Sequence, residues 1–232
     1  MVKRSKRYVQ AAAKVDPMRV YDLPAALALI KGLPAAKFDE SVEIVVRLGI
    51  DPRKTDQLVR GAVSLPKGLG KTVRVIVFAE GERADAARAA GADVVGAADL
   101  ADRIQGGWMD FDIVITSPDM MKHVGKLGKV LGPQGKMPSP KSGTVTPDVA
   151  SAVKEFKAGK VEFRTDAGGN VHAALGKRSF SVEDLLANLQ TFLEHVQSLR
   201  PPAVKGEFFR KISVSTSMGP GVLVRWEQLT HA

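Results

Sequence analysis

The sequence predicts a protein of mixed α/β and α+β class with two domains, one inserted into the other. Residues 37–65 and the residues after 160 alternate apolar and polar side chains at period two, as strands with one solvated face do. Residues 72–116 instead alternate apolar strand runs with Ala-rich helical segments, which is typical of βαβ units. A stretch rich in Gly, Lys and Pro at 66–71 separates the two patterns and is typical of a domain crossing.

The first part of the outer domain is predicted to contain two helices and two strands of one sheet. The second helix begins at Asp22 and Pro24, a helix cap followed by a favoured early-helix proline. The first strand has its apolar residues on one face and Glu43 and Arg47 on the other. The predicted elements are helices at 8–15 and 23–33 and strands at 42–48 and 59–65.

The inserted domain is predicted to span residues 67–159. Because strands alternate with helices, we expect a parallel sheet covered on both faces, a Rossmann-like arrangement. A long loop of Gly, Lys and Pro is expected at 125–143. The predicted strands are 72–79, 92–95 and 112–116, and the predicted helices are 82–90, 98–105 and 147–157.

After residue 160 the first pattern returns. The longest predicted helix begins with Ser181 and Asp184 at capping-box spacing and carries one apolar stripe. The sequence thus predicts a discontinuous α+β domain with an antiparallel sheet, residues 1–66 joined to 160–232. Its later elements are strands at 161–164 and 171–175, a hairpin signal at 166–170 between them, the helix at 181–199 and a strand at 208–217.

Composition narrows the functional classes. The absence of cysteine excludes disulfides, thiol catalysis and Cys-ligated zinc. A net charge of +9 favours a polyanionic partner, nucleic acid above all. Residues 67–159 hold 13 basic and 11 acidic side chains and the flanking segments hold 21 and 14, so the outer domain carries most of the excess.

No apolar run approaches the ~20 residues of a membrane helix, and no membrane association is expected. The N-terminus has no apolar core of a secretory signal. Its basic residues could imitate a transit peptide, although a small docked helix at 8–15 explains them as well.

No catalytic site is predicted. Gly70, Lys71 and Thr72 are similar to the end of a P-loop, but Leu65 stands where the motif needs its first glycine, and a strand follows. No G-x-G-x-x-G opens the insert, and the four histidines show no metal-ligand spacing. We therefore expect no catalytic residue, no metal and no cofactor, and predict a binding protein rather than an enzyme.

Three features fit RNA contact, each with a plainer alternative. Lys37 and Phe38 join a cation to an aromatic ring, although the residues alone slightly favour Phe38 as a core residue. His172 faces away from the apolar side of its strand and is either a surface histidine or one that faces a ligand. The small hydroxyls and glycine of residues 215–220 permit close approach to phosphates or 2′-hydroxyls, or form an ordinary β-turn.

Together these stretches resemble the bacterial ribosomal protein L-one family, proteins of the mobile side stalk of the large subunit. The resemblance spans nearly the whole chain in family order and is most specific at residues 131–145. The segments that carry it are KFDESVEIVVRLGIDPRKTDQLVRGAVSLPKGLGKTVRV, GWMDFDIVITSPDMM, GKLGKVLGPQGKMPSPKSGTVT, KAGKVEFRTD and STSMGPGV. Departures are Ser41 and Ser217, where threonine is common, and Gln134, Lys136 and Ser139 in the insert.

The resemblance implies the same split architecture and a discontinuous domain that binds large-subunit rRNA. It also implies a part in the release of deacylated tRNA from the exit site, and repression of translation from the protein's own operon mRNA. We expect a cytoplasmic protein on the large ribosomal subunit, monomeric when off the ribosome. The residues implied in RNA binding are Lys37, Phe38, Glu40, Ser41, Arg164, Asp166, His172, Thr216, Ser217, Met218 and Gly219.

Two other functions remain open from the sequence. A nucleotide-dependent enzyme would use the βαβ insert, and ligand binding would then stabilise the fold. A sequence-blind RNA chaperone would bind any structured RNA with similar affinity at a given salt concentration.

Overall fold

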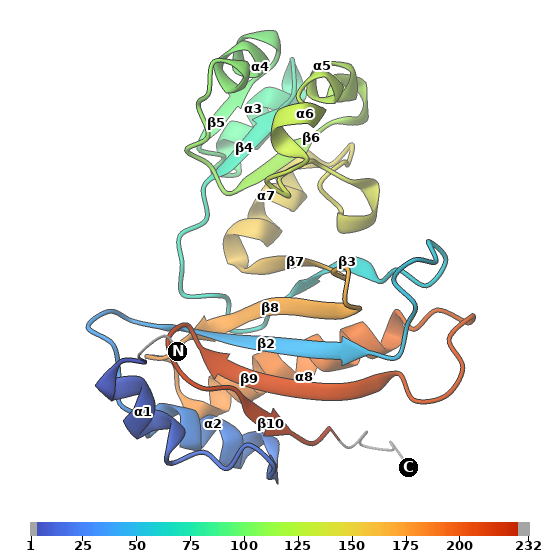
Figure 1. Ribbon diagram of the computed structural model, residues 1–232. Coiled ribbons are helices and arrows are strands. Elements are labelled where there is room, and N and C mark those ends of the chain that lie inside the picture. The colour runs from blue at the N-terminus through green and yellow to red at the C-terminus, as the bar shows by residue number, and fades with distance from the viewer. Residues whose placement is uncertain (1–3, 227–232) are drawn as a thin grey trace. The chain divides into compact units, whose positions relative to one another are not determined.

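The computed structural model describes residues 4–226, and residues 227–232 of the C-terminal tail lie outside that range (Figure 1). The chain forms two compact units. Unit 1 comprises Met1–Gly70 and Phe163–Ala232, and unit 2 comprises Lys71–Glu162. The sequence predicted the borders of the inserted domain at 66/67 and 159/160, so the borders in the structure lie three to four residues later.

Unit 1 is organised around a five-stranded sheet in the order β1-β10-β9-β2-β8. Strand β2 is antiparallel to both β8 and β9, β9 is antiparallel to β10, and β1 alone runs parallel to its neighbour, β10. The elements are α1 (Lys6–Ala12), β1 (Val20–Tyr21), α2 (Leu23–Lys31), β2 (Ser41–Leu48), β3 (Arg60–Ser64), β7 (Lys160–Arg164), β8 (Asn170–Lys177), α8 (Val182–Ser198), β9 (Phe209–Thr216) and β10 (Val222–Val224). Strand β7 begins in unit 2 and ends in unit 1.

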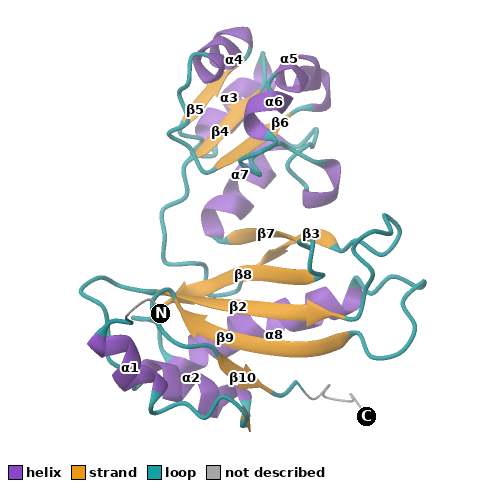
Figure 2. Cartoon of the chain, in the orientation of Figure 1, coloured by secondary structure: helices purple, strands orange, loops and turns teal. Residues whose placement is uncertain are grey.

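The alternation in β2 has the predicted effect. Its apolar residues are buried on the face of the sheet that α2 and α8 cover, where α2 contacts β9 and β10 and α8 contacts β8 (Figure 2). Helix α8 begins as its capping box predicts, because the Ser181 hydroxyl accepts a hydrogen bond from the Asp184 amide at 3.0 Å. Its apolar stripe is buried from Leu185 to Val196.

The prediction that β2 and β3 lie in one sheet is wrong. Both edges of β2 are already paired with β8 and β9, so β3 forms a separate two-stranded sheet with β7. A Cβ placed on Gly61 of β3 would lie 3.0 Å from the Leu199 side chain and 3.4 Å from the Phe163 ring. Strand β3 therefore packs beside the end of α8 rather than beside β2.

The turn predicted between β7 and β8 forms, but the strands beside it separate. The Asp166 amide donates to the Asn170 carbonyl at 2.8 Å, and Gly169 has a φ of +76°, a conformation that favours glycine. Strand β7 then pairs with β3, whereas β8 pairs with β2. Beyond one isolated antiparallel bridge between Thr165 and Val171, the hairpin predicted from the sequence does not continue into strand pairing.

Unit 2 contains a parallel three-stranded sheet in the order β5-β4-β6. Buried residues on one face pack against α3 and α7, and those on the other pack against α4, α5 and α6. The strands are β4 (Val75–Phe78), β5 (Val94–Gly96) and β6 (Ile113–Thr116). The helices are α3 (Glu82–Ala89), α4 (Ala98–Gln105), α5 (Met121–Lys126), α6 (Gly128–Leu131) and α7 (Val149–Ala158), with 3₁₀ turns at Pro118–Met120 and Pro140–Ser142.

The expected loop at 125–143 is partly helical. Its start belongs to α5 and α6, which the sequence analysis did not predict. The buried residues Met120, Val124, Leu127 and Leu131 recur at helical spacing and supply the apolar face of these short helices. Because two glycines and a nearby proline are typical of loops, they obscured the helical spacing of these apolar residues in the sequence.

Asn188 is a fully buried polar residue of α8 that fixes the segment leading to unit 2. Its side-chain oxygen accepts from the Lys67 amide at 3.0 Å. Its amide nitrogen donates to the carbonyls of Gly68 at 3.0 Å and Leu175 at 2.7 Å. One side chain thus satisfies three backbone groups of two separate segments.

We predict that Asn188→Leu lowers the free energy of unfolding of unit 1 by about 2–4 kcal/mol, because several buried backbone groups lose their partner. Denaturant unfolding followed by NMR signals of β8 and α8 measures this change. Glu194→Ala, an exposed change on the same helix, is the control. A cost within 0.5 kcal/mol, about that of an ordinary surface substitution, would contradict the assigned role.

Candidate nucleic-acid interface

The face of the unit 1 sheet opposite α2 and α8 carries mostly polar side chains in register across three strands. Exposed charges of both signs lie on it, and most of the residues between them are half-buried. Because successive side chains of a strand alternate faces, these residues cannot also enter the core. The cross-strand rows are Ala174–Glu43–Ser215, His172–Val45–Ser213 and Asn170–Arg47–Lys211.

Ser41 and Ser217 join the ends of β2 and β9. The Ser41 amide donates to the Ser217 hydroxyl at 3.1 Å, and the Ser217 amide donates to the Ser41 carbonyl at 3.0 Å. Lys177 of β8 donates to the Ser41 hydroxyl at 3.0 Å. The Ser41 and Ser217 hydroxyls therefore connect the ends of three strands.

A tight turn follows β9 and exposes Met218. The Gly219 amide donates to the Thr216 carbonyl at 3.0 Å, so this segment forms a β-turn. A Cβ at Gly219 would overlap the Thr216 hydroxyl, so a side chain there would displace the turn. Met218 is 51% exposed at its tip, whereas Thr216 is 5% exposed.

Glu40 is fully buried beneath this turn, although it was expected to contact RNA. Its Oε1 accepts from the Ala36 amide at 2.6 Å and from Arg7 at 3.2 Å. Arg7 also donates to the Met218 carbonyl at 3.2 Å. Burial raises the pKa of Glu40, but the neighbouring Thr216 side chain, the Ala36 amide and the Arg7 charge outweigh it and hold the pKa below its ordinary value. The side chain fixes the turn from below and presents no atom to solvent.

Lys37 and Phe38 lie on the surface just before Glu40. The interpretation of Phe38 as a core residue is wrong, because its side chain is 56% exposed. An exposed ring gains little from folding and is available to pack on a sugar or base.

Asp166 and His172 form a second polar group at the β7–β8 turn. The Asp166 carboxylate accepts from the Asn170 side chain at 3.0 Å and from the amides of Asn170 and Gly168 at 2.7 and 2.8 Å. Its Oδ2 lies 3.2 Å from Nε2 of His172. The Asn170 side chain above all, and then these amides, hold the pKa of Asp166 far below its usual range. Arg164 is exposed nearby in sequence, at the end of β7.

The predicted residues therefore form two groups rather than one. Ser41, which begins β2, belongs to the first group, and Val45, which pairs with His172, is four residues further along. At about 3.3 Å per residue, the two groups lie roughly 13 Å apart along the strand. Thr216 and Glu40 are buried supports, and the remaining predicted residues reach the surface at least in part.

Sequence reasoning missed Arg7 and Lys177. Arg7 comes from α1, 33 positions before Glu40, and no local pattern connects the two. For Arg47 and Lys211 a signal existed, because each lies on the polar side of an alternating strand.

Three carboxylates of unit 2 could suggest a metal site, but each forms an ion pair with a different basic residue. Asp110 pairs with Arg74, Asp112 with Lys71 and Asp119 with Arg83. Within residues 4–226, no three His, Asp or Glu side chains are grouped to hold a metal ion. In the same described range, no helix is long and apolar enough to cross a membrane.

A comparison with known families identifies the family of the chain. A profile of the "Ribosomal protein L1p/L10e family" matches residues 29–220. The chain belongs to the ribosomal protein L1 family. This family consists of ribosomal proteins rather than enzymes, in agreement with the prediction from sequence.

Individual relatives match over almost their full length. The chain is 56% identical to large ribosomal subunit protein uL1 of Bordetella pertussis, over 99% of both chains. It is 57% identical to the uL1 protein of Azoarcus sp. strain BH72, over 97% of both, and 53% identical to that of Kosmotoga olearia, over 96% of both. The L1 resemblance inferred from the quoted segments is confirmed.

Lys136 and Ser139, two residues of the inserted unit, have structural roles. Lys136 donates to the carbonyls of Met109 and Phe111 at 3.3 and 2.5 Å and lies over the Phe111 ring. The Ser139 amide donates to the Thr144 hydroxyl at 2.9 Å. These residues fix the segment 136–144 within unit 2.

We predict that Arg7→Met destabilises unit 1 by about 3 kcal/mol, because it removes the ion-pair partner of the buried Glu40 carboxylate. Glu40→Gln should cost less, since the 25%-exposed Arg7 side chain remains partly solvated. Urea denaturation of both variants measures the asymmetry. Equal costs, or no cost for Arg7→Met, would contradict the supporting role of the pair.

The ion pair between Arg7 and Glu40 also makes the stability of unit 1 depend on pH. Because the folded pKa of Glu40 lies below its ordinary value of 4.5, its contribution to stability is present above that pH and is lost as the pH falls through the folded pKa. Glu40→Gln should therefore flatten the stability curve below pH 4.5.

For the second group, we predict that Asn170→Ala raises the pKa of Asp166 toward its ordinary value of 3.8, and by more than His172→Ala does. The Asn170 side chain is the larger cause of the depression. Carboxyl-carbon NMR titration measures both variants against the unaltered chain. A larger shift in His172→Ala would reverse the assignment.

Proposed function

We propose that the chain is a structural constituent of the large ribosomal subunit and that unit 1 binds large-subunit rRNA through the surface described above. Membership of the L1 family and the names of the relatives support the assembly. The charge balance of the flanking segments, 21 basic against 14 acidic side chains, supports a polyanionic partner. We infer that unit 1 is the RNA-binding domain and that unit 2 is a Rossmann-like insertion.

The observation that carries this proposal is the exposure of Phe38 and Met218 beside a fixed polar frame. Phe38 precedes β2 and Met218 follows β9, and hydrogen bonds between Ser41 and Ser217 hold those two strand ends together. Arg7 connects the buried Glu40 to the Met218 carbonyl, so the frame is set before any ligand binds. Preorganisation of this kind reduces the entropy lost on binding.

The chemistry of the surface fits a folded RNA rather than a plain phosphate array. Serine hydroxyls and turn amides can bond 2′-hydroxyls, the Phe38 ring can pack on a sugar or base, and basic residues such as Lys37, Arg47 and Lys211 can meet phosphates. The Asp166 carboxylate, which stays ionised, can accept from base amines or 2′-hydroxyls. We therefore assign recognition to shape and direct contacts, with electrostatics adding salt-dependent affinity.

Finer roles follow from the same surface and from the L1 resemblance. We propose binding at the mobile side stalk, participation in release of tRNA from the exit site, and repression of the chain's own operon mRNA through an rRNA-like site. A single surface that binds rRNA and messenger in turn makes repression a competition between them. The free chain is then a cytoplasmic monomer.

We predict that Phe38→Ala and Met218→Ala each weaken binding to the rRNA stalk fragment by roughly 5- to 150-fold, about 1–3 kcal/mol for loss of an interface contact. Filter binding at matched salt concentrations measures the dissociation constants. Met18→Ala is the matched control, because Met18 is 87% exposed and belongs to the same unit. Equal losses in all three variants would remove the assignment.

A scrambled hairpin tests the other functions. Equal affinity of the unaltered chain for the stalk fragment and the hairpin, falling together with salt, would indicate a sequence-blind RNA chaperone. A rise in melting temperature with millimolar nucleotide would instead indicate the nucleotide-dependent function.

A further inference from the structure

Positive charge in unit 2 is concentrated in one segment. Residues 120–147 contain five lysines and no Asp or Glu. The remainder of unit 2, residues 71–119 and 148–162, contains eight basic and twelve acidic side chains. The small net charge of the unit therefore hides a strongly basic region within an acidic one.

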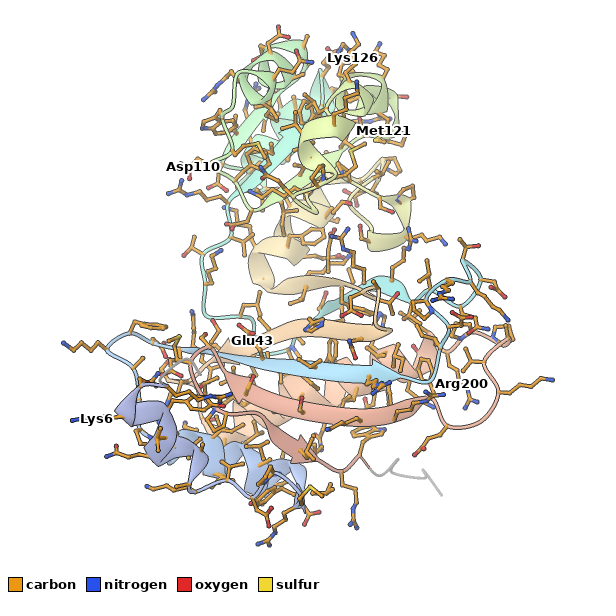
Figure 3. The ribbon with its side chains drawn as sticks, in the orientation of Figure 1. Lys6, Glu43, Asp110, Met121, Lys126 and Arg200 are labelled. Atoms are coloured by element: carbon orange, nitrogen blue, oxygen red, sulfur yellow. The ribbon has the colours of Figure 1, made fainter. Side chains whose placement is uncertain are left out.

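Three of these lysines form a stripe on α5 and α6. Lys122 and Lys126 are exposed one helical turn apart on α5, and Lys129 is exposed on α6, the short helix that follows. Figure 3 labels Lys126 on the outer side of unit 2. The opposite face of the same segment is buried in the core of unit 2, through Met120, Val124, Leu127 and Leu131. The stripe thus faces solvent from a firmly packed base.

The stripe lysines have no acidic partner among the described residues. The ion pairs of unit 2 use other cations, namely Lys71, Arg74, Arg83, Arg88, Lys157 and Lys160. Lys136 of the same segment donates to backbone carbonyls instead. Within the described chain, nothing neutralises the three charges of the stripe.

Gly125 and Gly128 lie between the lysines, and the fold does not require either of them. Both are helical with negative φ, and a Cβ added to either would meet no atom within 4 Å. By contrast, a Cβ at Gly132 would lie 2.6 Å from the Gly128 carbonyl oxygen. Glycine in a helix is less stable than alanine, so the two bare positions have a cost that packing does not explain. They leave the helix backbone open to close approach.

We propose that this stripe, Lys122, Lys126 and Lys129 with Gly125 and Gly128, is a second RNA site that holds the phosphate backbone of an RNA double helix. Phosphates meet the lysines, and the glycines let the sugar-phosphate chain approach the helix. The exposed large apolar side chains of the described residues all belong to unit 1, so the stripe offers none for base stacking or for a protein interface core. The site therefore reads no sequence and does not depend on the unit 1 surface.

The first test measures salt dependence in the full chain with a 20-base-pair RNA duplex of arbitrary sequence. Replacing Lys122, Lys126 and Lys129 together by Gln should lower the slope of log affinity against log salt by about 2–3, as loss of three phosphate contacts does. The matched control replaces Arg83, Arg88 and Lys154 by Gln, which removes equal charge elsewhere in unit 2. A slope unchanged in the stripe variant, or lowered equally in the control, overturns the proposal.

The second test separates this site from the unit 1 surface. In a chain carrying Phe38→Ala and Met218→Ala, the duplex should still shift amide NMR signals of residues 122–131. Gly125→Ala should keep or raise the melting temperature while it weakens duplex binding severalfold. Absence of the amide shifts, unaltered binding by Gly125→Ala, or displacement of the duplex by an equal concentration of poly-glutamate would each overturn a phosphate-backbone site.

Discussion

The register of β2 is the constraint on which unit 1 depends. Because β2 is paired on both edges, a slip of one residue would turn Glu43 and Arg47 into the core and Ile44 and Val46 into solvent. The helices on one face hold that register through buried apolar contacts. The polar rows on the other face, and the position of Ser41 beside Ser217, are then fixed consequences of core packing.

Burial of Glu40 shows how the core supports the surface at one end of this strand. A buried carboxylate is costly unless it is paired, and here Arg7 and the Ala36 amide supply the partners. Since Arg7 also bonds the Met218 carbonyl, the charge pair connects α1, the start of β2 and the turn after β9. Glu40, which was expected to contact RNA, thus lies beneath the surface and holds its exposed neighbours in place.

The sequence predicted features with a local cause, such as the alternation in β2 and the Ser181 cap, and the site residues came from family segments. It failed where the cause is distant. β3 was assigned to the wrong sheet because β8 and β9 occupy both edges of β2, and these strands follow β2 by more than 120 residues in the sequence. The burial of Glu40 required Arg7, and the helices α5 and α6 were hidden because Gly125 and Gly128 signal a loop. Those two glycines lie in helices where a side chain would meet no neighbour, so packing does not explain them.

The two surfaces differ in the kind of information they can carry. Unit 1 combines an exposed ring, hydroxyls and an ionised carboxylate in fixed positions, and a set of that kind discriminates one RNA shape from another. The lysine stripe of unit 2 has charge and open backbone but no exposed aromatic or large apolar side chain, so it adds affinity without selecting sequence. Joined in one chain, the second contact raises the local concentration of duplex RNA for the first without altering which RNA is chosen. Specificity and strength can then change independently, the former through the strand ends of unit 1 and the latter through the number of lysines in unit 2.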